Sequence, residues 1–366
     1  MLPTLLFILH LPPPVHGASM VGKYIQDSQY IKSRFDCHYI NLTTAKDLSD
    51  IGKLNWKKLK QFIILLLNIR KTVKLLKPSL VYVTPNSKGG AFYKDFIVVQ
   101  MLKLMGCRVV LHYHNKGVSK RQERFLDNLL YYYFFKNTKV ILLANSLYED
   151  IEKYVSINDI YICPNGIPES IINASNISTP PNTFKLLFLS NLLKSKGVCV
   201  LLEACQILRK QEYKFVCEFV GGETEDFDSV SFQKELKKRK LEDCVYYLGK
   251  KYGSEKELIL QNAKLFILPT FDDCFPLVLL EAMQHKIVCI STNEGGISDI
   301  IEHGQTGFIV EKNNPEDLAE KIVILIKNDE LRIKMGEAGY KLFKSKYTLS
   351  AFEKHFVDVL DQNLVS

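Results

Sequence analysis

Two carboxylates, Asp273 and Glu281, lie eight positions apart across the expected start of a helix. Pro276 suits the first helical position, because its missing N–H costs nothing there and its φ is already helical. The N–H groups of Leu277 and Val278 are then unpaired and directed at an anion. At about 1.5 Å per residue, Glu281 lies roughly 7 to 8 Å beyond Pro276. One carboxylate could hold a sugar, the amides a diphosphate and the other carboxylate a ribose; two solvated acids on a helix edge are the alternative.

The stretch Leu265-Phe-Ile-Leu-Pro-Thr-Phe-Asp-Asp-Cys-Phe-Pro-Leu-Val-Leu-Leu-Glu-Ala-Met283 resembles the E-x7-E signature of retaining GT-B glycosyltransferases of family 4, the glycosyl transferases group 1. Tyr246-Tyr-Leu-Gly249 and the block Glu294-Gly-Gly-Ile-Ser-Asp-Ile-Ile-Glu-His-Gly-Gln-Thr-Gly-Phe-Ile-Val310 follow the family's usual order and spacing. The family normally has Glu and Gly where this chain has Asp273 and Cys274. The resemblance implies that Asp273 is catalytic and grips the sugar hydroxyls, and that Glu281 holds the ribose. It also implies a donor-binding loop and helix start formed by Phe275, Pro276, Leu277 and Val278.

A second donor-binding segment follows the first expected strand of the second domain, in Leu189-Ser-Asn-Leu-Leu-Lys-Ser-Lys-Gly197. The family resemblance implies an Arg and a Lys-Gly here, whose cations hold the diphosphate. Lys196 and Gly197 match, and Asn191 stands in place of the Arg. An amide donates a hydrogen bond but neutralises no charge, so the diphosphate is held less tightly or with the help of another cation.

In the first domain, Val109-Val-Leu-His-Tyr-His-Asn115 ends an expected buried strand, and the strand period of two places His112 and His114 on one face. The resemblance to the family's strand ending in His implies that His114 lies near the transferred sugar as a catalytic residue. Gly17, in Val15-His-Gly-Ala-Ser19, is a donor-binding candidate because glycine lets the backbone approach a phosphate closely. A tight turn after three prolines explains the same glycine.

Stretches of buried strand type alternate with helical stretches along both halves of the chain, which predicts parallel βαβ units. The strands are expected near 5–9, 37–41, 80–84, 108–113, 139–143 and 159–163, and again near 184–189, 214–220, 245–247, 265–268, 288–291 and 308–309, with a first helix near 20–32. The predicted fold is α/β of the GT-B type, with two doubly wound Rossmann-like domains facing across a cleft. The expected domains are residues 1–168, on the acceptor side, and 184–348, which binds the nucleotide-sugar, with a linker at about 169–183. The resemblance implies that the last helix, about 349–364, packs back on the first domain.

Charge is distributed unevenly: residues 1–180 hold 23 Lys and Arg against 12 Asp and Glu, whereas residues 181–366 hold 25 against 28. From Lys53 to Lys77 there are eight Lys or Arg and no acid, with apolar residues at helical spacing. Such a basic amphipathic helix can contact an anionic membrane, although its apolar stripe is better suited to packing on a sheet. No nucleic-acid motif accompanies the charge. Nine scattered cysteines without C-x-x-C spacing favour free thiols in a reducing cytoplasm, and no signal peptide is evident.

The sequence therefore predicts a cytoplasmic enzyme, peripheral on the inner face of the membrane, that moves a sugar from a nucleoside-diphosphate donor to a glycan or lipid-linked acceptor. The resemblance implies retained anomeric configuration, no metal or other cofactor, and a role in cell-surface polysaccharide or lipopolysaccharide synthesis. The motif Asp226-Phe-Asp228 resembles the metal-binding D-x-D of the other large glycosyltransferase fold, but its charged surroundings favour a solvated loop. Two alternatives remain: a GT-B sugar-nucleotide epimerase, and a non-catalytic subunit that binds glycan or lipid.

Overall fold

The computed structural model describes residues 2–42, 56–170 and 184–365, and its chain forms two compact units. Unit 1 comprises Met1–Gly166 together with Leu349–Ser366, and unit 2 comprises Ile167–Thr348. Each unit is built around one six-stranded sheet. Most of the expected linker, residues 171–183, lies outside the described residues.

The unit 1 sheet is parallel throughout and has the strand order β2-β1-β3-β4-β5-β6. Its inner strands β1, β3, β4 and β5 are short and mostly apolar, and nearly all their side chains are buried, as expected for a sheet covered on both faces. The strand bounds are β1 Thr4–Leu9, β2 Asp36–Asn41, β3 Leu80–Val83, β4 Val109–His112, β5 Lys139–Leu142 and β6 Ile160–Ile162. The helices of the unit are α1 Gly17–Asp27, α2 Gln29–Arg34, α3 Trp56–Leu76, α4 Gly89–Leu104, α5 Phe125–Phe135 and α13 Leu349–Val365.

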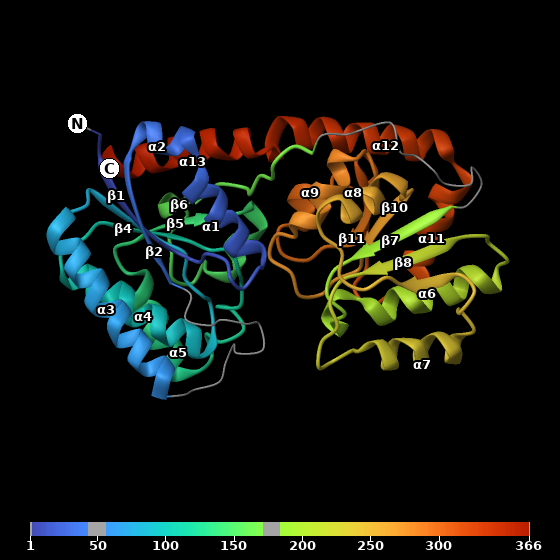
Figure 1. The fold of residues 1–366 in the computed structure, drawn as a ribbon, viewed down its shortest axis with the longest axis horizontal. Helices are drawn as coiled ribbons and strands as arrows, with labels where there is room; N and C mark the ends of the chain where they lie inside the picture. The colour runs from blue at the N-terminus through green and yellow to red at the C-terminus, as the bar shows by residue number, and fades with distance from the viewer. Residues whose placement is uncertain (1, 43–55, 171–183, 366) are drawn as a thin grey trace. The chain divides into compact units, whose positions relative to one another are not determined.

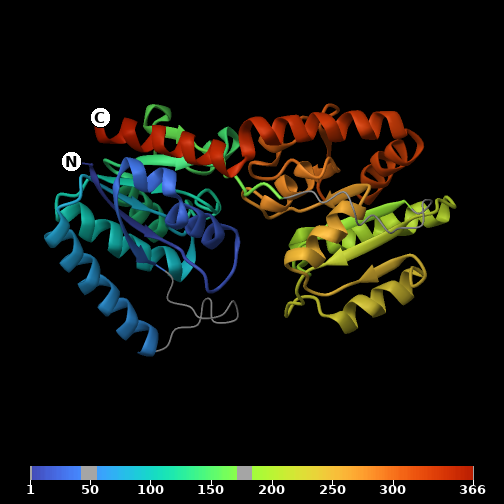
Figure 2. The ribbon, with the colours of Figure 1, turned by 45° about the horizontal axis from the view of Figure 1, so that its top comes forward.

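Helices α3, α4 and α5 cover one face of this sheet, while α1, α2 and α13 cover the other (Figure 1). The C-terminal helix α13 belongs to unit 1, as the family resemblance implied. Its Phe356 ring lies 5.2 Å from that of Tyr82 on β3, and Arg108 donates to the carbonyl oxygen of Asn363 at 3.0 Å. Figure 2 shows α13 lying along this sheet on the side away from α3.

The predicted first helix, near 20–32, is wrong in its bounds, because the structure has two helices there. α1 begins at Gly17 and ends at Asp27, and α2 begins at Gln29. Ser28 separates them: its hydroxyl oxygen accepts a hydrogen bond from the N–H of Ile31 and so caps α2. Serine favours such a cap over a helix interior because its side chain competes for backbone N–H groups.

The unit 2 sheet is also parallel, with the strand order β12-β11-β10-β7-β8-β9. Helices α6, α7 and α11 cover one face, while α8, α9 and α12 cover the other (Figure 1). The strands are β7 Lys185–Leu189, β8 Val216–Val220, β9 Val245–Tyr247, β10 Leu265–Leu268, β11 Val288–Thr292 and β12 Gly307–Val310. The helices are α6 Val198–Lys210, α7 Ser229–Arg239, α8 Gly253–Asn262, α9 Leu277–Gln284, the short α10 Ile297–Ile300, α11 Pro315–Lys327 and α12 Asp329–Leu342.

In each sheet the strand order reverses at one point, which lies between β1 and β3 in unit 1 and between β7 and β10 in unit 2. In unit 1 the chain passes from β1 to β2 on one side and returns to β3 on the other. In unit 2 it leaves β7 toward β8 and β9 and returns to β10 on the opposite side. Ligands of doubly wound sheets bind beyond the carboxyl ends of the strands at such a point. The topology therefore directs attention to the loops that follow β1 and β3, and to those that follow β7 and β10.

Candidate functional site

The unit 2 site is formed by the loops after β7 and β10, which carry Lys196 and Asp273. Their ammonium nitrogen and carboxylate oxygen lie 2.8 Å apart, and both side chains are less than one-fifth exposed. Lys196 also donates to the carbonyl oxygen of Asp272 at 2.9 Å. Burial raises the pKa of Asp273 above its usual value, and the neighbouring ammonium opposes that rise. Two residues that the sequence assigned to different parts of a donor are thus partners at the sheet's reversal point.

Gly197 allows these two loops to approach each other. Its φ of +83° lies in the left-handed region, and a Cβ there would lie only 2.1 Å from the carbonyl oxygen of Pro269. The N–H of Phe271 and the hydroxyl of Thr270 both donate to the carbonyl oxygen of Ser195, at 2.9 and 3.1 Å. A glycine is therefore needed at position 197, since any side chain there would push the β10 loop, and Asp273 with it, away from Lys196.

The start of α9 differs from the prediction by one position. Pro276 is the N-cap, with ψ of 110°, and Leu277 is the first helical residue. Proline keeps the φ of a helix but offers no side-chain acceptor, so only its carbonyl oxygen bonds the first turn, accepting from the N–H of Leu279 at 3.1 Å. Among the described residues, the N–H groups of Leu277 and Val278 have no acceptor. The predicted pair of free amides at a helix N-terminus is therefore present, and such groups favour anions.

Phe275 was predicted to bind the donor, but its side chain faces the core. It is 6 % exposed, and its ring centroid lies 6.1 Å from that of Tyr347. The Gly-Gly block after β11 holds the same loop from another side. The N–H of Gly296 donates to the carbonyl oxygen of Cys274 at 2.7 Å, and a Cβ at Gly295 would lie 2.4 Å from the carbonyl oxygen of Asp273. These contacts fix the backbone that carries Asp273.

Glu281, on α9, has a partner that sequence reasoning missed. Its Oε1 accepts from the ammonium of Lys256 on α8 at 2.9 Å, while its Oε2 is buried and has no partner within the described residues. Lys256 belongs to no motif, and only the packing of α8 beside α9 reveals it. Another such pair, Glu294 with Lys312, lies beyond β11. Carboxylates on this side of the sheet are held by lysines.

Asn191 ties the loop after β7 to the loop after β8. Its Oδ1 accepts from the N–H of Gly222 at 3.0 Å, and the N–H of Leu192 donates to the carbonyl oxygen of Gly222 at 2.7 Å. The amide oxygen is thus occupied by backbone. The side-chain NH₂ of Asn191 has no acceptor among the described residues, so it remains able to donate to a ligand.

In unit 1, the groups at the reversal point are histidines and amides. His10 follows β1 and Asn86 follows β3, and their side-chain nitrogens lie 3.4 Å apart. His112 ends β4 and His114 follows two residues later, with ring centroids 4.2 Å apart. The prediction that these two histidines share a face is confirmed.

Burial keeps these histidines neutral. It lowers the pKa of His114 to about 3, with a smaller contribution from His16, and lowers that of His10 to about 3, with Lys94 as the next contributor. The pKa of His112 is also well below its usual value because of burial. The Nδ1 of His112 lies 2.7 Å from the hydroxyl of Tyr82. Nδ1 of His114 is buried and has no partner in the described part of the chain.

Sequence reasoning missed Asp95, a carboxylate inside unit 1. It is fully buried on α4, and its Oδ2 accepts from both the backbone N–H and the side-chain NH₂ of Asn86 at 2.8 Å. Burial raises its pKa above the usual value. Asp95 therefore fixes the amide that faces His10. Its sequence context, an acid in an otherwise apolar helical stretch, was the available signal.

Gly17 is the first residue of α1. The tight turn that the sequence offered as an alternative explanation is therefore not present at this residue. Its φ is not left-handed, and nothing in the protein lies within 4 Å of where its Cβ would be. The residue before it, His16, caps the helix by accepting from the N–H of Ser19 through Nδ1 at 3.3 Å. Neither conformation nor crowding within the protein requires glycine here, and the assignment of Gly17 to donor binding stays a prediction.

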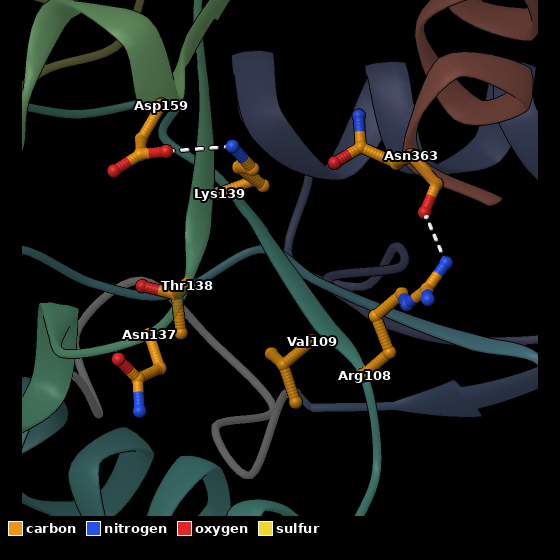
Figure 3. Close-up of a pocket in the computed structure, with 7 residues that line it drawn as sticks. All are labelled: Arg108, Val109, Asn137, Thr138, Lys139, Asp159 and Asn363. Atoms are coloured by element: carbon orange, nitrogen blue, oxygen red, sulfur yellow. Dashed lines mark hydrogen bonds and ion pairs between the residues drawn. The ribbon is translucent and has the colours of Figure 1, made fainter. Parts of the chain in front are cut away.

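A hollow of about 330 Å³ in unit 1 lies at the other end of the sheet. It is lined by Arg108, Val109, Asn137, Thr138, Lys139, Asp159 and Asn363, and Figure 3 shows these side chains with the Lys139–Asp159 and Arg108–Asn363 contacts. Val109 and Lys139 begin their strands, so the hollow is at the amino ends. Parallel α/β sheets bind their ligands at the carboxyl ends, and we do not assign it a ligand.

The motif Asp226-Phe-Asp228 serves a local purpose in the structure. Asp228 is the N-cap of α7, and its carboxylate accepts from the N–H of Ser231 at 2.8 Å. No group of three or more His, Cys, Asp or Glu within the described residues is arranged to hold a metal ion. None of the described helices is both long and apolar enough to cross a membrane. All nine cysteines are free thiols.

Residues 169–342 match the family model of the glycosyl transferases group 1. The match covers 174 of the 366 residues, so unit 2 is similar to this family over most of its length. It is 29% identical over 248 residues to the N-acetyl-alpha-D-glucosaminyl L-malate synthase of Bacillus anthracis, covering 64% of this chain and 63% of that protein. It is 26% identical over 256 residues to the amylovoran biosynthesis glycosyltransferase AmsK of Erwinia amylovora, covering 65% and 58%. The matches thus span about three fifths of these relatives' own length.

The whole fold is shared with solved GT-B structures. The crystal structure of HepE from Anabaena in complex with UDP superimposes with a TM-score of 0.74, covering 99% of this chain and 100% of that chain at 14% identity. Sucrose-phosphate synthase from Thermosynechococcus elongatus has the same TM-score and identity, and 99% of each chain is covered. The predicted α/β fold of GT-B type is confirmed.

Proposed function

We propose that this protein is a member of the glycosyl transferases group 1. In this proposal it transfers a sugar from a nucleoside-diphosphate-sugar to a glycan or lipid-linked acceptor, with retained anomeric configuration, in cell-surface polysaccharide or lipopolysaccharide synthesis. The observation that carries the proposal is the pairing of Lys196 with Asp273 at the reversal point of the unit 2 sheet, beside the free amides of Leu277 and Val278. A cation and helix amides suit a diphosphate, and a carboxylate beside them suits sugar hydroxyls. The UDP bound by HepE supports the choice of donor class.

In this mechanism the departing diphosphate gains negative charge, which Lys196 and the α9 amides stabilise more strongly in the transition state than in the ground state. Asp273 accepts hydrogen bonds from the sugar, and Glu281 accepts from the ribose. In unit 1, His114 and Gly17 are proposed to face the reacting sugar and the donor phosphate. We favour direct attack by the acceptor on the sugar face from which the diphosphate leaves.

The first test of the proposal is a donor screen. UDP-, GDP- and ADP-sugars are compared for thermal stabilisation of the protein, since a ligand at 100 times its dissociation constant adds about 2.7 kcal/mol. Transfer to an acceptor extract follows with the best donor, and proton NMR of the product reports the anomeric configuration. An inverted product would refute retention, and absence of stabilisation by all three donor classes would refute the donor assignment.

Product analysis separates the two alternatives from transfer. A sugar-nucleotide epimerase converts its substrate with no acceptor present, whereas a transferase returns it unchanged or slowly hydrolysed. A non-catalytic binding subunit produces neither transfer nor hydrolysis. We propose that the enzyme needs no metal ion or other cofactor, because Lys196 and the helix amides supply the charge that a metal would. Activity should persist in EDTA; loss that manganese restores would contradict this.

We further propose that unit 1 contacts an anionic membrane surface, which is where a lipid-linked acceptor would be found. In the predicted stripe on α3, Ile69 and Val73 are buried and Phe62 and Leu66 are half-buried. In the first half of the helix Trp56 is 85%, Ile63 50% and Leu67 60% exposed. Of these three residues only Ile63 belongs to the stripe, so the expectation that the stripe serves packing is not contradicted, and the exposed residues lie beside it. Lys53, the first cation of the predicted segment, lies outside the described residues.

The outward face of α3 combines these apolar residues with exposed cations: Lys60, Arg70, Lys71 and Lys74. Helix α5, which packs on α4 on the same face of the sheet, adds exposed apolar side chains, among them Phe125 at 84% and Leu126 at 57%. Exposed aromatic and aliphatic residues beside lysines suit the interface of an anionic bilayer, where the apolar groups enter the headgroup region and the cations meet lipid phosphates.

Flotation with vesicles tests this surface. The parent is expected to bind vesicles containing phosphatidylglycerol and to bind neutral phosphatidylcholine vesicles less. Replacing Trp56, Ile63 and Leu67 with Ser should weaken binding at both low and high salt. The matched control replaces two exposed apolar residues of unit 2, Val230 and Ile333, with Ser. Equal loss in the control, or no binding by the parent, would refute the membrane contact.

A further inference from the structure

We propose that Lys250 is a second cation of the diphosphate site in unit 2. The inference rests on the proposed nucleoside-diphosphate donor and assigns a residue that no motif in the sequence indicated. Lys250 follows β9 and the glycine of Tyr246-Tyr-Leu-Gly249. Its position is set by three loops at the carboxyl ends of β7, β8 and β9, which are bonded to one another.

The loop after β8 joins its two neighbours through its glycines. The N–H of Gly221 donates to the carbonyl oxygen of Gly249 at 3.0 Å, and the hydroxyl of Tyr247 donates to the carbonyl oxygen of Gly221 at 2.9 Å. On the other side, the N–H of Gly222 donates to Oδ1 of Asn191 at 3.0 Å. The residue after Gly249 is thereby placed next to the segment that carries Asn191.

Gly222 leaves room for the Lys250 side chain. A Cβ at Gly222 would lie 2.4 Å from Cε of Lys250, 3.3 Å from its ammonium nitrogen and 2.9 Å from Oδ1 of Asn191. The φ of Gly222 is not left-handed, so space, not conformation, is the reason for a glycine. The Lys250 side chain lies over bare backbone, and its ammonium is on the same side of the loop as the Asn191 amide.

The charges around the site show why a second cation matters. Four lysines of unit 2 that lie near the predicted donor residues are paired with carboxylates: Lys196 with Asp273, Lys251 with Glu255, Lys256 with Glu281 and Lys312 with Glu294. Lys250 is exposed and has no partner among the described residues. The Lys196–Asp273 pair has no net charge, and Asn191 contributes a donor without charge. Lys250 therefore supplies positive charge that the diphosphate needs and that the paired lysines do not.

The test uses calorimetry to compare the binding of UDP with that of uridine, which lacks the phosphates. If the parent protein prefers another base, GDP and guanosine, or ADP and adenosine, replace this pair. Lys250→Ala should weaken UDP binding about tenfold, in line with the loss of one charge-assisted hydrogen bond, and leave uridine binding unchanged. Lys250→Arg should bind UDP within about threefold of the parent, because the charge is kept. In steady-state assays, Lys250→Ala should raise the donor KM and leave kcat at saturating donor unchanged.

The neighbouring Lys251→Ala is the matched control, because it removes a lysine whose charge is already met by Glu255. It should bind UDP as the parent does. Unchanged UDP binding in Lys250→Ala overturns the inference about Lys250 while leaving the donor assignment intact. Equal weakening in both lysine variants also overturns it, since general surface charge then explains the effect. Absence of binding by the parent to UDP, GDP and ADP instead refutes the proposed donor.

Discussion

Units 1 and 2 both contain a doubly wound sheet. At the point where the strand order reverses, the polar groups of unit 2 are charged, whereas the histidines of unit 1 are neutral. In unit 2, Asp273 and Glu281 are held by Lys196 and Lys256 in ion pairs. In unit 1, the histidines His10 and His114 are half-buried, and loss of solvation lowers their pKa values to about 3. One site is built from charges and the other from neutral hydrogen-bonding groups.

The difference indicates which part of a substrate each site suits. A diphosphate can take Lys196 from Asp273, because a phosphate oxygen replaces the carboxylate oxygen as the ammonium's acceptor. Asp273 is then free to accept from sugar hydroxyls next to the phosphate. Neutral imidazoles can donate to and accept from hydroxyl groups without bringing a buried charge. We propose that unit 2 supplies the charged groups that bind the anionic part of the donor, and that the histidines of unit 1 offer uncharged hydrogen bonds to hydroxyl groups.

The largest effect is expected from removing the Asp273 carboxylate. Asp273→Asn keeps the volume but loses an anion, and a hydrogen bond to a charged group is worth about 1.5–3 kcal/mol. Turnover should fall roughly ten- to hundredfold at about 1.4 kcal/mol per decade. Asp273→Glu should retain activity with altered donor preference, and Asp272→Asn, the exposed neighbour, should behave as the parent. Steady-state kinetics with two donor sugars measures this, and unchanged turnover in Asp273→Asn would remove the carboxylate from the mechanism.

Lys196→Ala should affect the donor and not the acceptor. Loss of one charge-assisted contact to phosphate is expected to weaken donor binding about tenfold. Because the same change leaves Asp273 buried without its cation, thermal stability should also fall, and Lys196→Arg should restore both. Calorimetry with the donor and the acceptor KM measure the two effects separately. Equal donor affinity in variant and parent would show that the ion pair is only structural.

Much of this comparison could be predicted from the sequence, because strands and glycine-bearing loops leave local signals. Apolar runs located all the strands to within about two residues, and Lys196-Gly197 marked a loop that requires glycine. The partners were not predictable, since Lys256 meets Glu281 and Asp95 meets Asn86 only after helices pack. The burial of the Phe275 side chain was not predictable for the same reason, since its neighbour Tyr347 is far away in sequence. On α3, the exposed Ile63 and the buried Val73 follow the same helical period, so the sequence alone does not show which of them packs on the protein.

A smaller effect is expected at Glu281, because the ribose is remote from the reacting carbon. Glu281→Gln should raise the donor KM several-fold and leave kcat nearly unchanged, as expected for binding that is equal in ground and transition states. Lys256→Ala removes the partner that positions Glu281 and should act in the same direction. Lys251→Ala, on the same side of the sheet, serves as control. If Glu281→Gln lowers kcat instead, the carboxylate acts nearer the chemistry than we propose.

The smallest effect concerns the neutral histidines of unit 1 and their dependence on pH. An unfolded histidine binds a proton below about pH 6.5, whereas folded His114, with a pKa of about 3, does not. Between these values the unfolded state holds more protons, so stability falls as the pH falls. Between pH 7 and pH 5 each such histidine lowers the free energy of unfolding by up to about 2 kcal/mol.

His114→Asn, neutral at every pH, should lose less stability over this interval, as measured by hydrogen exchange of β4 peptides. His355→Asn, at an exposed position on α13, should match the parent. Equal pH dependence in parent and His114→Asn would mean that this imidazole is charged in the folded protein, and the contrast between the two units would be lost.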